Sequence, residues 1–260
     1  MSTEATERGP AAQGDERFDI ELPETNGQEF DQDQEWCEVE IDGERRRIRF
    51  HDYHEIYRHP GLYEQIFYEE LECDSPRTVS TLLAGQLGMD ELDPADLRVL
   101  DVGAGNGMVA EELKKFGAGT AVGVDIIEEA KVAAERDRPD VYADYFVCDL
   151  TDLPPDVKEE LKGYNFNCLV TVAALGFGDI PPEAFSTAYN LVEPGALIGF
   201  NIKEDFIDEE HDTGFSKMIR RALEDGTMKL EAQARYQHRL SVAGEPLYYV
   251  AHIARKQRDL

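Results

Sequence analysis

The spacing of hydrophobic and polar residues divides the chain into two parts. From residue 98 to residue 200, short apolar runs alternate with amphipathic stretches, which predicts repeated strand–helix units around a parallel sheet. Two β-like segments then flank a glycine- and proline-containing turn at 243–246, which predicts an antiparallel hairpin at a sheet edge. The predicted strands are 99–102, 122–125, 142–147, 166–172, 228–237 and 247–254, and the predicted helices are 108–116, 128–136, 156–161, 182–191 and 215–223.

The N-terminal part has a different pattern. Residues 1–34 are polar, acidic and poor in large apolar side chains, so we expect a disordered acidic tail. Residues 36–41 alternate with period two, and Asp42-Gly43 is a strong turn signal, which favours a small β-hairpin over an irregular arm. Residues 51–68 are dense in aromatic residues and histidines. We therefore divide the chain into a tail (1–34), an N-terminal hairpin and helical segment (35–92) and a main domain (93–260).

The most informative stretch is 99–107, in which a buried strand runs into a glycine-rich turn. Gly103, Gly105 and Gly107 stand at alternate positions, where they let the backbone adopt positive φ and approach a ligand closely. A second strand ends in Asp125, and an acid at a strand end can bind the two hydroxyls of a ribose. These features predict a nucleoside-binding crevice rather than a plain tight turn. Met108 stands where the dinucleotide fingerprint has its third glycine, which disfavours NAD.

The pattern D-x-G-x-G-x-G at 101–107, the strand-end acid and the turn at 191–198 resemble motifs of class I S-adenosylmethionine-dependent methyltransferases. The resemblance covers roughly residues 99–255. It implies an α/β fold with a Rossmann-like, seven-stranded, mostly parallel sheet in the order 3-2-1-4-5-7-6, helices on both faces, an antiparallel C-terminal hairpin and an N-terminal helical lid. It also implies S-adenosyl-L-methionine as the cofactor and S-adenosyl-L-homocysteine as the product.

The resemblance assigns individual residues to the cofactor. The glycine turn would abut the methionine part, Asp125 would bind the ribose, and Asp149 would accept a hydrogen bond from the adenine amino group. For Asp149 the alternative is a helix cap or a turn acid, which is common. The predicted cofactor-binding residues are Asp101, Gly103, Ala104, Gly105, Asn106, Gly107, Asp125, Ile126, Asp149, Leu150, Val172 and Ala173.

Residues 172–184, 201–206 and 214–215 resemble one subgroup more closely, the Williams–Beuren-region methyltransferase-like proteins. Substrates of that subgroup are poorly defined, so the acceptor stays open. Two functions remain in view: a methyltransferase acting on a small molecule, and a non-catalytic cofactor-binding module that regulates a partner. A closed aromatic cavity beside the methyl position would favour the enzyme, and an open flat face would favour the module. An NAD-linked dehydrogenase is a weaker third possibility.

The acceptor pocket is expected beyond the carboxyl ends of strands four and five, because ligands of parallel sheets bind there. The aromatic segment 57–67 would lie opposite, although such rings also pack helices onto sheets. The predicted pocket residues are Tyr57, Tyr63, Phe67, Leu175, Phe177 and Lys203. A base is needed only if the acceptor carries a proton at working pH. The candidate catalytic bases are His54, His59, Asp179 and Glu204, although exposed turn acids are common.

The net charge of the chain restricts the classes of molecule that it can bind. The formal net charge is −29, from 55 acidic and 26 basic residues, and such a field repels nucleic acid. The cluster Arg45-Arg46-Arg47 fits an exposed strand face better than a nucleic-acid groove. A small-molecule substrate is therefore expected. Lysine supplies only nine of the 26 basic residues, and this bias also resembles proteins of organisms with a salty cytoplasm.

The remaining expectations concern location and ligands. Four scattered cysteines without a C-x-x-C pair indicate reduced thiols in the cytoplasm. No apolar run approaches a membrane span, and no basic-then-apolar signal opens the chain. His51, His54 and His59 lack metal-ligand spacing, so no metal is expected. The protein is expected to be a monomer or a homodimer.

Overall fold

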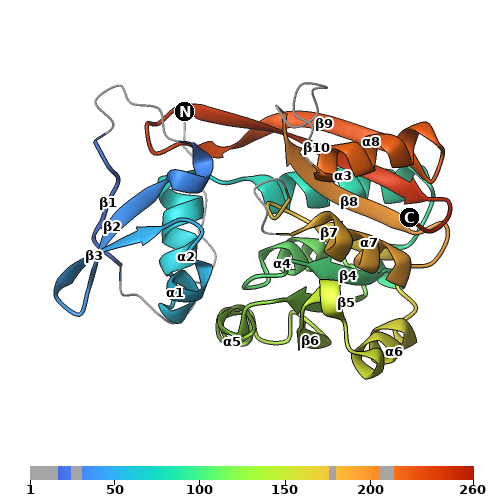
Figure 1. The fold of residues 1–260 in the computed structure, drawn as a ribbon, viewed down its shortest axis with the longest axis horizontal. Coiled ribbons are helices and arrows are strands. Elements are labelled where there is room, and N and C mark those ends of the chain that lie inside the picture. The colour runs from blue at the N-terminus through green and yellow to red at the C-terminus, as the bar shows by residue number, and fades with distance from the viewer. Residues whose placement is uncertain (1–16, 25–30, 176–179, 205–213) are drawn as a thin grey trace, which may run out of the picture.

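A computed structural model describes residues 17–24, 31–175, 180–204 and 214–260. Its main feature is a seven-stranded sheet in the order β6-β5-β4-β7-β8-β10-β9 (Figure 1). Counted from the first strand of this sheet, that order is the predicted 3-2-1-4-5-7-6, so the fold prediction is confirmed. The strands are β4 (Arg98–Val102), β5 (Thr120–Asp125), β6 (Asp144–Val147), β7 (Cys168–Thr171), β8 (Leu197–Lys203), β9 (Met228–Leu240) and β10 (Pro246–Lys256).

The central strands are parallel and buried on both faces, which explains their continuous apolar runs. Leu100 of β4 aligns with Val122 of β5 on one side and with Leu169 of β7 on the other. The last two strands form the predicted antiparallel hairpin, and β10 also pairs with β8 in antiparallel register. The strand order across the sheet reverses between β4 and β7. The carboxyl ends of these two parallel strands form the crevice where open α/β sheets bind ligands.

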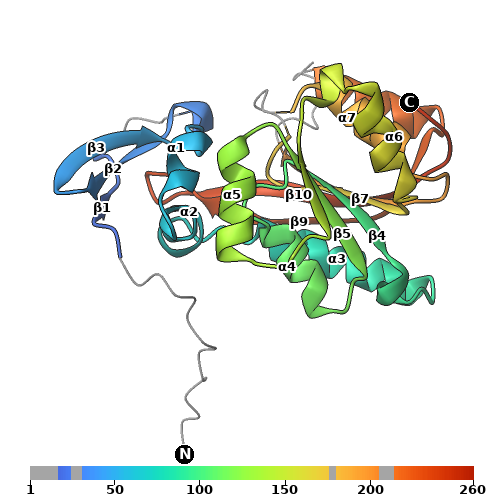
Figure 2. The ribbon, with the colours of Figure 1, turned by 90° about the horizontal axis from the view of Figure 1, so that it is seen from below.

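Helices cover both faces of this sheet (Figure 2). Helices α3 (Ser75–Met89) and α4 (Met108–Lys115) pack on one face, around Val99, Val170 and Ile253. Helices α6, α7 and α8 pack on the other, around Leu100 and Ile198. Helix α5 contacts β5, β6 and α1. The bounds of these last helices are α5 (Glu128–Asp137), α6 (Pro155–Gly163), α7 (Pro182–Leu191) and α8 (Gly214–Glu224), and short 3-10 helices span η3 (Pro94–Asp96) and η4 (Leu150–Asp152).

Residues 17–24 and 31–74 form a second, smaller unit that we call the cap. Its sheet contains the predicted hairpin, in which Trp36 aligns with Arg49. Helices pack against this sheet around Phe50 and Ile66. Long strands β9 and β10 reach from the main sheet towards the cap (Figure 1), and Val242 joins its core. The cap elements are β1 (Ile20–Glu21), η1 (Gln32–Gln34), β2 (Trp36–Ile41), β3 (Glu44–Arg49), α1 (Tyr53–Arg58), α2 (Leu62–Glu64) and the π-helix η2 (Gln65–Glu70).

Two sequence-based boundaries need correction. The tail was expected to be disordered through residue 34, but Ile20 pairs with Val39 of β2, and η1 begins at Gln32. Phe18 and Ile20 pack on the cap core, and these few apolar side chains outweigh the acidic composition around them. The main domain was expected to begin at residue 93, but α3 packs on its sheet, so it begins at about residue 75.

No helix within the described ranges has the length and apolar character that a membrane crossing requires.

Candidate active site

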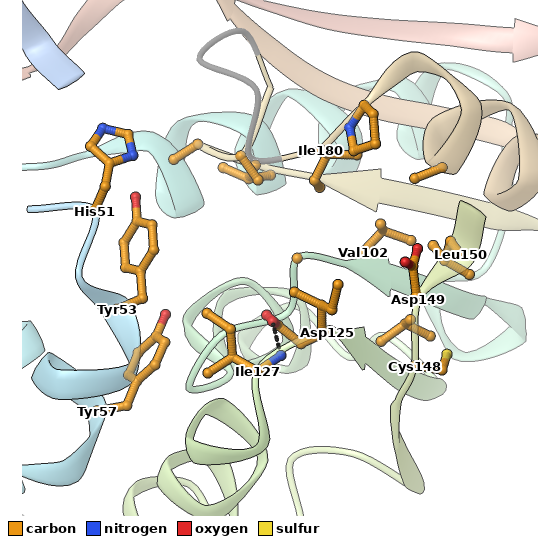
Figure 3. Close-up of a pocket in the computed structure, with 18 of the residues that line it drawn as sticks. His51, Tyr53, Tyr57, Val102, Asp125, Ile127, Cys148, Asp149, Leu150 and Ile180 are labelled. Carbon is orange, nitrogen blue, oxygen red and sulfur yellow. Dashed lines mark hydrogen bonds between the residues drawn. The ribbon is translucent and has the colours of Figure 1, made fainter. Parts of the chain in front are cut away.

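A cleft of about 260 Å³ lies at the carboxyl ends of β4 to β7, between the sheet and the cap (Figure 3). Strand ends form its floor, and aromatic residues of the cap form one wall. Ile180, which precedes α7, lies on the side opposite the floor. Pro181 also lines the cleft. Seven of the predicted cofactor residues line it: Gly103, Asp125, Ile126, Asp149, Leu150, Val172 and Ala173.

The glycine turn shapes the floor. Gly103, Gly105 and Gly107 have φ values of +68°, +53° and +89°, a region that side-chain-bearing residues rarely adopt. The N–H groups of Gly103 and Ala104 both donate to the Val124 carbonyl, at 2.9 and 3.2 Å. A Cβ on Gly103 would lie 2.9 Å from the Cβ of Ala174, so the turn has no room for a side chain there. This prediction of positive φ is confirmed.

Asp125 ends β5 and lines the cleft. One carboxylate oxygen accepts the N–H of Gly105 at 2.9 Å, and the other accepts the N–H of Ile127 at 3.0 Å, the bond drawn in Figure 3. Burial raises the pKa of Asp125 above its usual value of 3.8, and these backbone donors counteract that effect. Each oxygen keeps a lone pair for a ligand, so the carboxylate is fixed in place and able to accept two hydroxyl hydrogen bonds.

Asp101 does not line the cleft. It is 1% exposed beneath the glycine turn and accepts a hydrogen bond of 2.7 Å from the Tyr142 hydroxyl. Burial raises the pKa of Asp101 to about 7, partly offset by this bond. Ala104, Asn106 and the two later glycines of the turn also lie outside the cleft lining, where they shape the loop.

Asp149 is a helix cap that also lines the cleft. It lines the cleft after β6, and its Oδ1 accepts the N–H of Thr151 at 2.8 Å and its hydroxyl at 2.7 Å, so that it caps η4. Those two bonds lower the pKa of Asp149, which keeps the carboxylate ionised. Apolar side chains beside it, including Val102 and Leu150, form a slot suited to a flat base.

Aromatic residues of the cap face Asp125 across the cleft. Tyr53 and Tyr57 line it (Figure 3), and so does Tyr63. The ring centroids of Tyr53 and Tyr57 lie 6.2 Å apart, and those of Tyr57 and Tyr63 lie 5.1 Å apart. A Cβ on Gly105 would lie 2.5 Å from the Tyr57 hydroxyl, so the cap presses directly on the glycine turn. These contacts line one side of the cleft with aromatic rings.

A hydrogen-bond network around Glu64 fixes the outer side of the glycine turn. Glu64 of α2 accepts hydrogen bonds from the side chains of Asn106 at 2.7 Å and Arg138 at 2.8 Å, and Arg138 also donates to the Asn106 carbonyl at 3.2 Å. The guanidinium thus has a carboxylate partner already. A carboxylate next to the turn repels a phosphate, which disfavours a dinucleotide at this site.

The loop after β7 is held by a residue of the neighbouring strand. Ala173 has φ +58°, and its N–H donates to the Asn201 side chain of β8 at 2.7 Å. Asn201 in turn donates to the Tyr236 hydroxyl of β9 at 2.7 Å. This buried network fixes the backbone at the inner end of the cleft, and no sequence motif indicated it.

Three of the candidate bases, His54, His59 and Glu204, lie outside this lining. His54 is exposed, and His59 lies 3.7 Å from Glu55. Glu204 is paired with Arg235 at 2.7 Å. The predicted pocket residue Lys203 also lies off the cleft lining, whereas Tyr57 and Tyr63 are part of it. Phe67 and Leu175 line a smaller adjoining cavity. Asp179 and Phe177 lie outside the described residues.

Sequence analysis missed His51, which lines both the cleft and the adjoining cavity. Its position was visible in the sequence: it follows the hairpin and stands two residues before Tyr53. The histidine was passed over because it was weighed only as a metal ligand.

Comparison with known proteins identifies the family of the chain. A model of the family described as "Methyltransferase domain" matches residues 72–234, which is more than half of the chain. The chain belongs to this family. The matched segment runs from the end of the cap through the sheet to β9 and contains the glycine turn, Asp125 and Asp149. No curated protein matches the chain.

Solved structures of methyltransferases are among those similar to this chain. An S-adenosylmethionine-dependent methyltransferase from Clostridium acetobutylicum has 12% identity and a TM-score of 0.50, over 75% of this chain and 96% of its own. A magnesium protoporphyrin IX methyltransferase from Synechocystis has 17% identity and a TM-score of 0.48, over 70% of this chain and 79% of its own. A methyltransferase from Mesorhizobium loti has 19% identity and a TM-score of 0.46, over 66% and 96%. The first of these likenesses shows the fold alone.

The residues present fit the predicted cofactor. The methyltransferase family supports S-adenosyl-L-methionine, which needs a ribose acceptor, a flat apolar slot and a turn that tolerates close approach. Asp125, the slot beside Asp149 and the turn at Gly103 supply these three features within one cleft.

Proposed function

We propose that this methyltransferase is an active enzyme that transfers a methyl group from S-adenosyl-L-methionine to a small-molecule acceptor. The observation that carries the proposal is Asp125, whose fixed carboxylate faces a wall of cap tyrosines across a cleft of about 260 Å³. The strongly negative charge also disfavours nucleic acid.

The chain's own residues bind, orient and exclude water. S-adenosyl-L-methionine, when bound, supplies a methyl group already activated by the positive charge of its sulfonium. Asp125 would hold the ribose hydroxyls, and Asp149 would hold the adenine amino group. Tyr53 and Tyr57 would close the cleft and present ring faces, which favour a nearby cation. Alignment of acceptor and methyl within about 3–3.5 Å then gives most of the rate enhancement.

We propose His51 as the proton acceptor for an acceptor molecule that must lose a proton. It lines the junction of the cleft and the adjoining cavity, whereas His54 is exposed. Replacement of His51 by Asn should lower turnover by about 10²–10⁴-fold and leave the affinity for S-adenosyl-L-homocysteine unchanged. The matched control, His54→Asn, should keep full turnover. Full turnover of the His51 variant would remove this role.

The proposal also covers the subgroup, the location, the oligomeric state and the salt environment of the protein. The resemblance to the Williams–Beuren-region subgroup rests on residues 172–184, 201–206 and 214–215. A cytoplasmic location is supported by four cysteines that form no disulfide. We expect a monomer or a homodimer, which sedimentation would decide. A salt-rich cytoplasm would be supported if the protein loses stability on transfer to low-salt buffer.

One experiment separates this proposal from its alternatives. Calorimetry should show binding of S-adenosyl-L-homocysteine and no binding of NAD, and incubation with S-adenosyl-L-methionine and a metabolite extract should release S-adenosyl-L-homocysteine. Binding without release from any extract would favour the non-catalytic regulatory module. Binding of NAD alone would overturn the proposal.

A further inference from the structure

A second cavity continues inward from the cleft. It measures about 50 Å³ and shares four lining residues with the cleft, so the two spaces adjoin. It lies between the cap and the ends of β9 and β10. The shared residues are His51, Tyr53, Tyr63 and Ala173. A molecule with its reacting atom in the cleft beside His51 could therefore extend into the second cavity.

One polar group in this cavity lacks a hydrogen-bond partner. Gln32 of η1 is 5% exposed and lines the cavity. Its Oε1 accepts the Tyr249 hydroxyl at 3.0 Å, whereas its Nε2 has no hydrogen-bond partner. A buried amide without a partner is unfavourable, and native structures leave few of them. A ligand oxygen in the cavity would accept the free N–H and remove this penalty.

The other polar side chains around the cavity already have partners. Arg239 is paired with the buried carboxylate of Glu35, and its Nη1 donates to the Leu240 carbonyl at 2.7 Å. Burial lowers the pKa of His238 well below its usual value, so it is neutral, and its Nδ1 lies 2.6 Å from the Ser75 hydroxyl. Because the buried charges cancel as a pair, the cavity favours a neutral ligand group over an anion.

The remaining walls are flat or apolar. They include Phe50, Tyr53, Tyr63, Phe67 and Leu175, beside Cys73 and Ala173. Tyr63 and Phe67 lie with ring centroids 4.7 Å apart. Such walls favour a planar ring, which packs against aromatic faces.

We propose that this second cavity is the specificity subsite for the methyl acceptor: it receives the far end of a flat aromatic molecule and binds a neutral carbonyl oxygen there through Gln32 Nε2. The inference rests on the proposed function, because it places the methylated atom in the cleft beside His51. It adds the substrate class, a single-ring compound with a nucleophilic group at one end and an uncharged carbonyl at the other.

Matched probes test this directly. We would titrate the protein, saturated with S-adenosyl-L-homocysteine, with 4-hydroxyacetophenone, 4-ethylphenol and 4-hydroxybenzoate in a calorimeter. The ketone should bind about tenfold more tightly than 4-ethylphenol, which has the same shape without the carbonyl. It should also bind more tightly than the anionic benzoate. Equal affinities, preference for the benzoate or no binding of any probe would overturn the inference.

Variants assign the preference to one side chain. Gln32→Leu should reduce the preference for the ketone to about twofold or less, and Gln32→Glu should do the same because a carboxylate cannot donate. Gln34→Leu is the matched control, since Gln34 is exposed on the same short helix. A preference retained by both Gln32 variants would also overturn the inference. If wild-type protein fails to bind S-adenosyl-L-homocysteine, the proposed function fails with it; if it binds, only the subsite is in question.

Discussion

The two sides of the cleft are built in different ways. On the sheet side, backbone geometry holds the site: the turn at Gly103 and Gly105 has positive φ, and Asp125 is fixed by two main-chain N–H groups. On the cap side, side chains hold it, and they come from distant parts of the sequence. Glu35 and Arg239, which join the cap to β9, are 204 residues apart.

The difference separates the two tasks of a transferase. The sheet side is held by backbone geometry and depends on few side chains. It therefore suits a ligand that stays the same, such as the cofactor. A wall built from side chains can change its chemistry one residue at a time without disturbing the sheet. Cofactor binding is therefore expected to depend on the sheet side, and acceptor choice on the cap side. The predictions below test this division.

The largest effect is expected where the cap is joined to the sheet. Arg239→Met would leave the fully buried Glu35 carboxylate without its partner, which should lower the free energy of unfolding by about 3–5 kcal/mol. Adding Glu35→Leu should restore part of this loss, since the lone buried charge is then gone. Urea unfolding measures both. A loss below about 1 kcal/mol for the single variant would show that the cap does not depend on this pair.

The next effect is expected where the two sides touch. Gly105→Ala places a Cβ at positive φ and 2.5 Å from the Tyr57 hydroxyl, which should lower the free energy of unfolding by about 2–3 kcal/mol. In a Tyr57→Phe background, the clash with the hydroxyl is absent, and the loss should fall by about 1 kcal/mol. The same loss in both backgrounds would mean that the cap does not press on the turn.

A pH dependence should come from the sheet side. The pKa of Asp101 is raised from 3.8 to about 7 on folding. The folded protein therefore binds more protons than the unfolded chain between these values, and the stability contributed by this group falls as pH rises, by at most about 1.4 kcal/mol per pH unit.

Asp101→Asn removes this titration and still accepts a hydrogen bond from Tyr142. Wild-type protein should lose about 2 kcal/mol relative to the variant between pH 5 and pH 7, measured as urea midpoints. Parallel stability curves for the two proteins would show that Asp101 ionises freely.

The smallest effect is expected on the outer edge of the cap. Arg45 pairs with Asp19 at 3.1 Å and Glu21 at 2.9 Å, all three being solvent-accessible. Arg45→Ala should lower the free energy of unfolding by less than about 1 kcal/mol, and salt should reduce the difference further. Amide exchange at Ile20 in β1 should nevertheless speed up. If Arg45→Ala lowered the free energy of unfolding as much as Arg239→Met does, the edge of the cap would not be weakly held.

The sheet side could be predicted from the sequence because its signals are local. Positive φ demands glycine at 103, 105 and 107, and the strand-end acid follows at a family-typical distance. Strand order followed from the family resemblance, and the hairpin between β2 and β3 from the Asp42-Gly43 turn.

The cap side could not be predicted in this way, because its contacts are non-local. No spacing rule brings Gln32 to Tyr249 or places His51 between two cavities. The candidate bases rest on residue type and nearness in sequence. In the structure, His59 lies beside Glu55, and Glu204 accepts a hydrogen bond from Arg235. The extent of the tail was overestimated because acidic composition concealed the few apolar residues that fix β1.

The central claim is that Asp125 holds the ribose of an adenosyl sulfonium cofactor, and calorimetry with S-adenosyl-L-homocysteine tests it most directly. Asp125→Asn should weaken binding by about 10- to 100-fold, since hydrogen bonds to a charged acceptor are lost. Asp156→Asn, which removes an equal charge from an exposed position, should bind like wild type. Unchanged affinity in the Asp125 variant, or a wild-type protein that ignores the compound, would contradict the account.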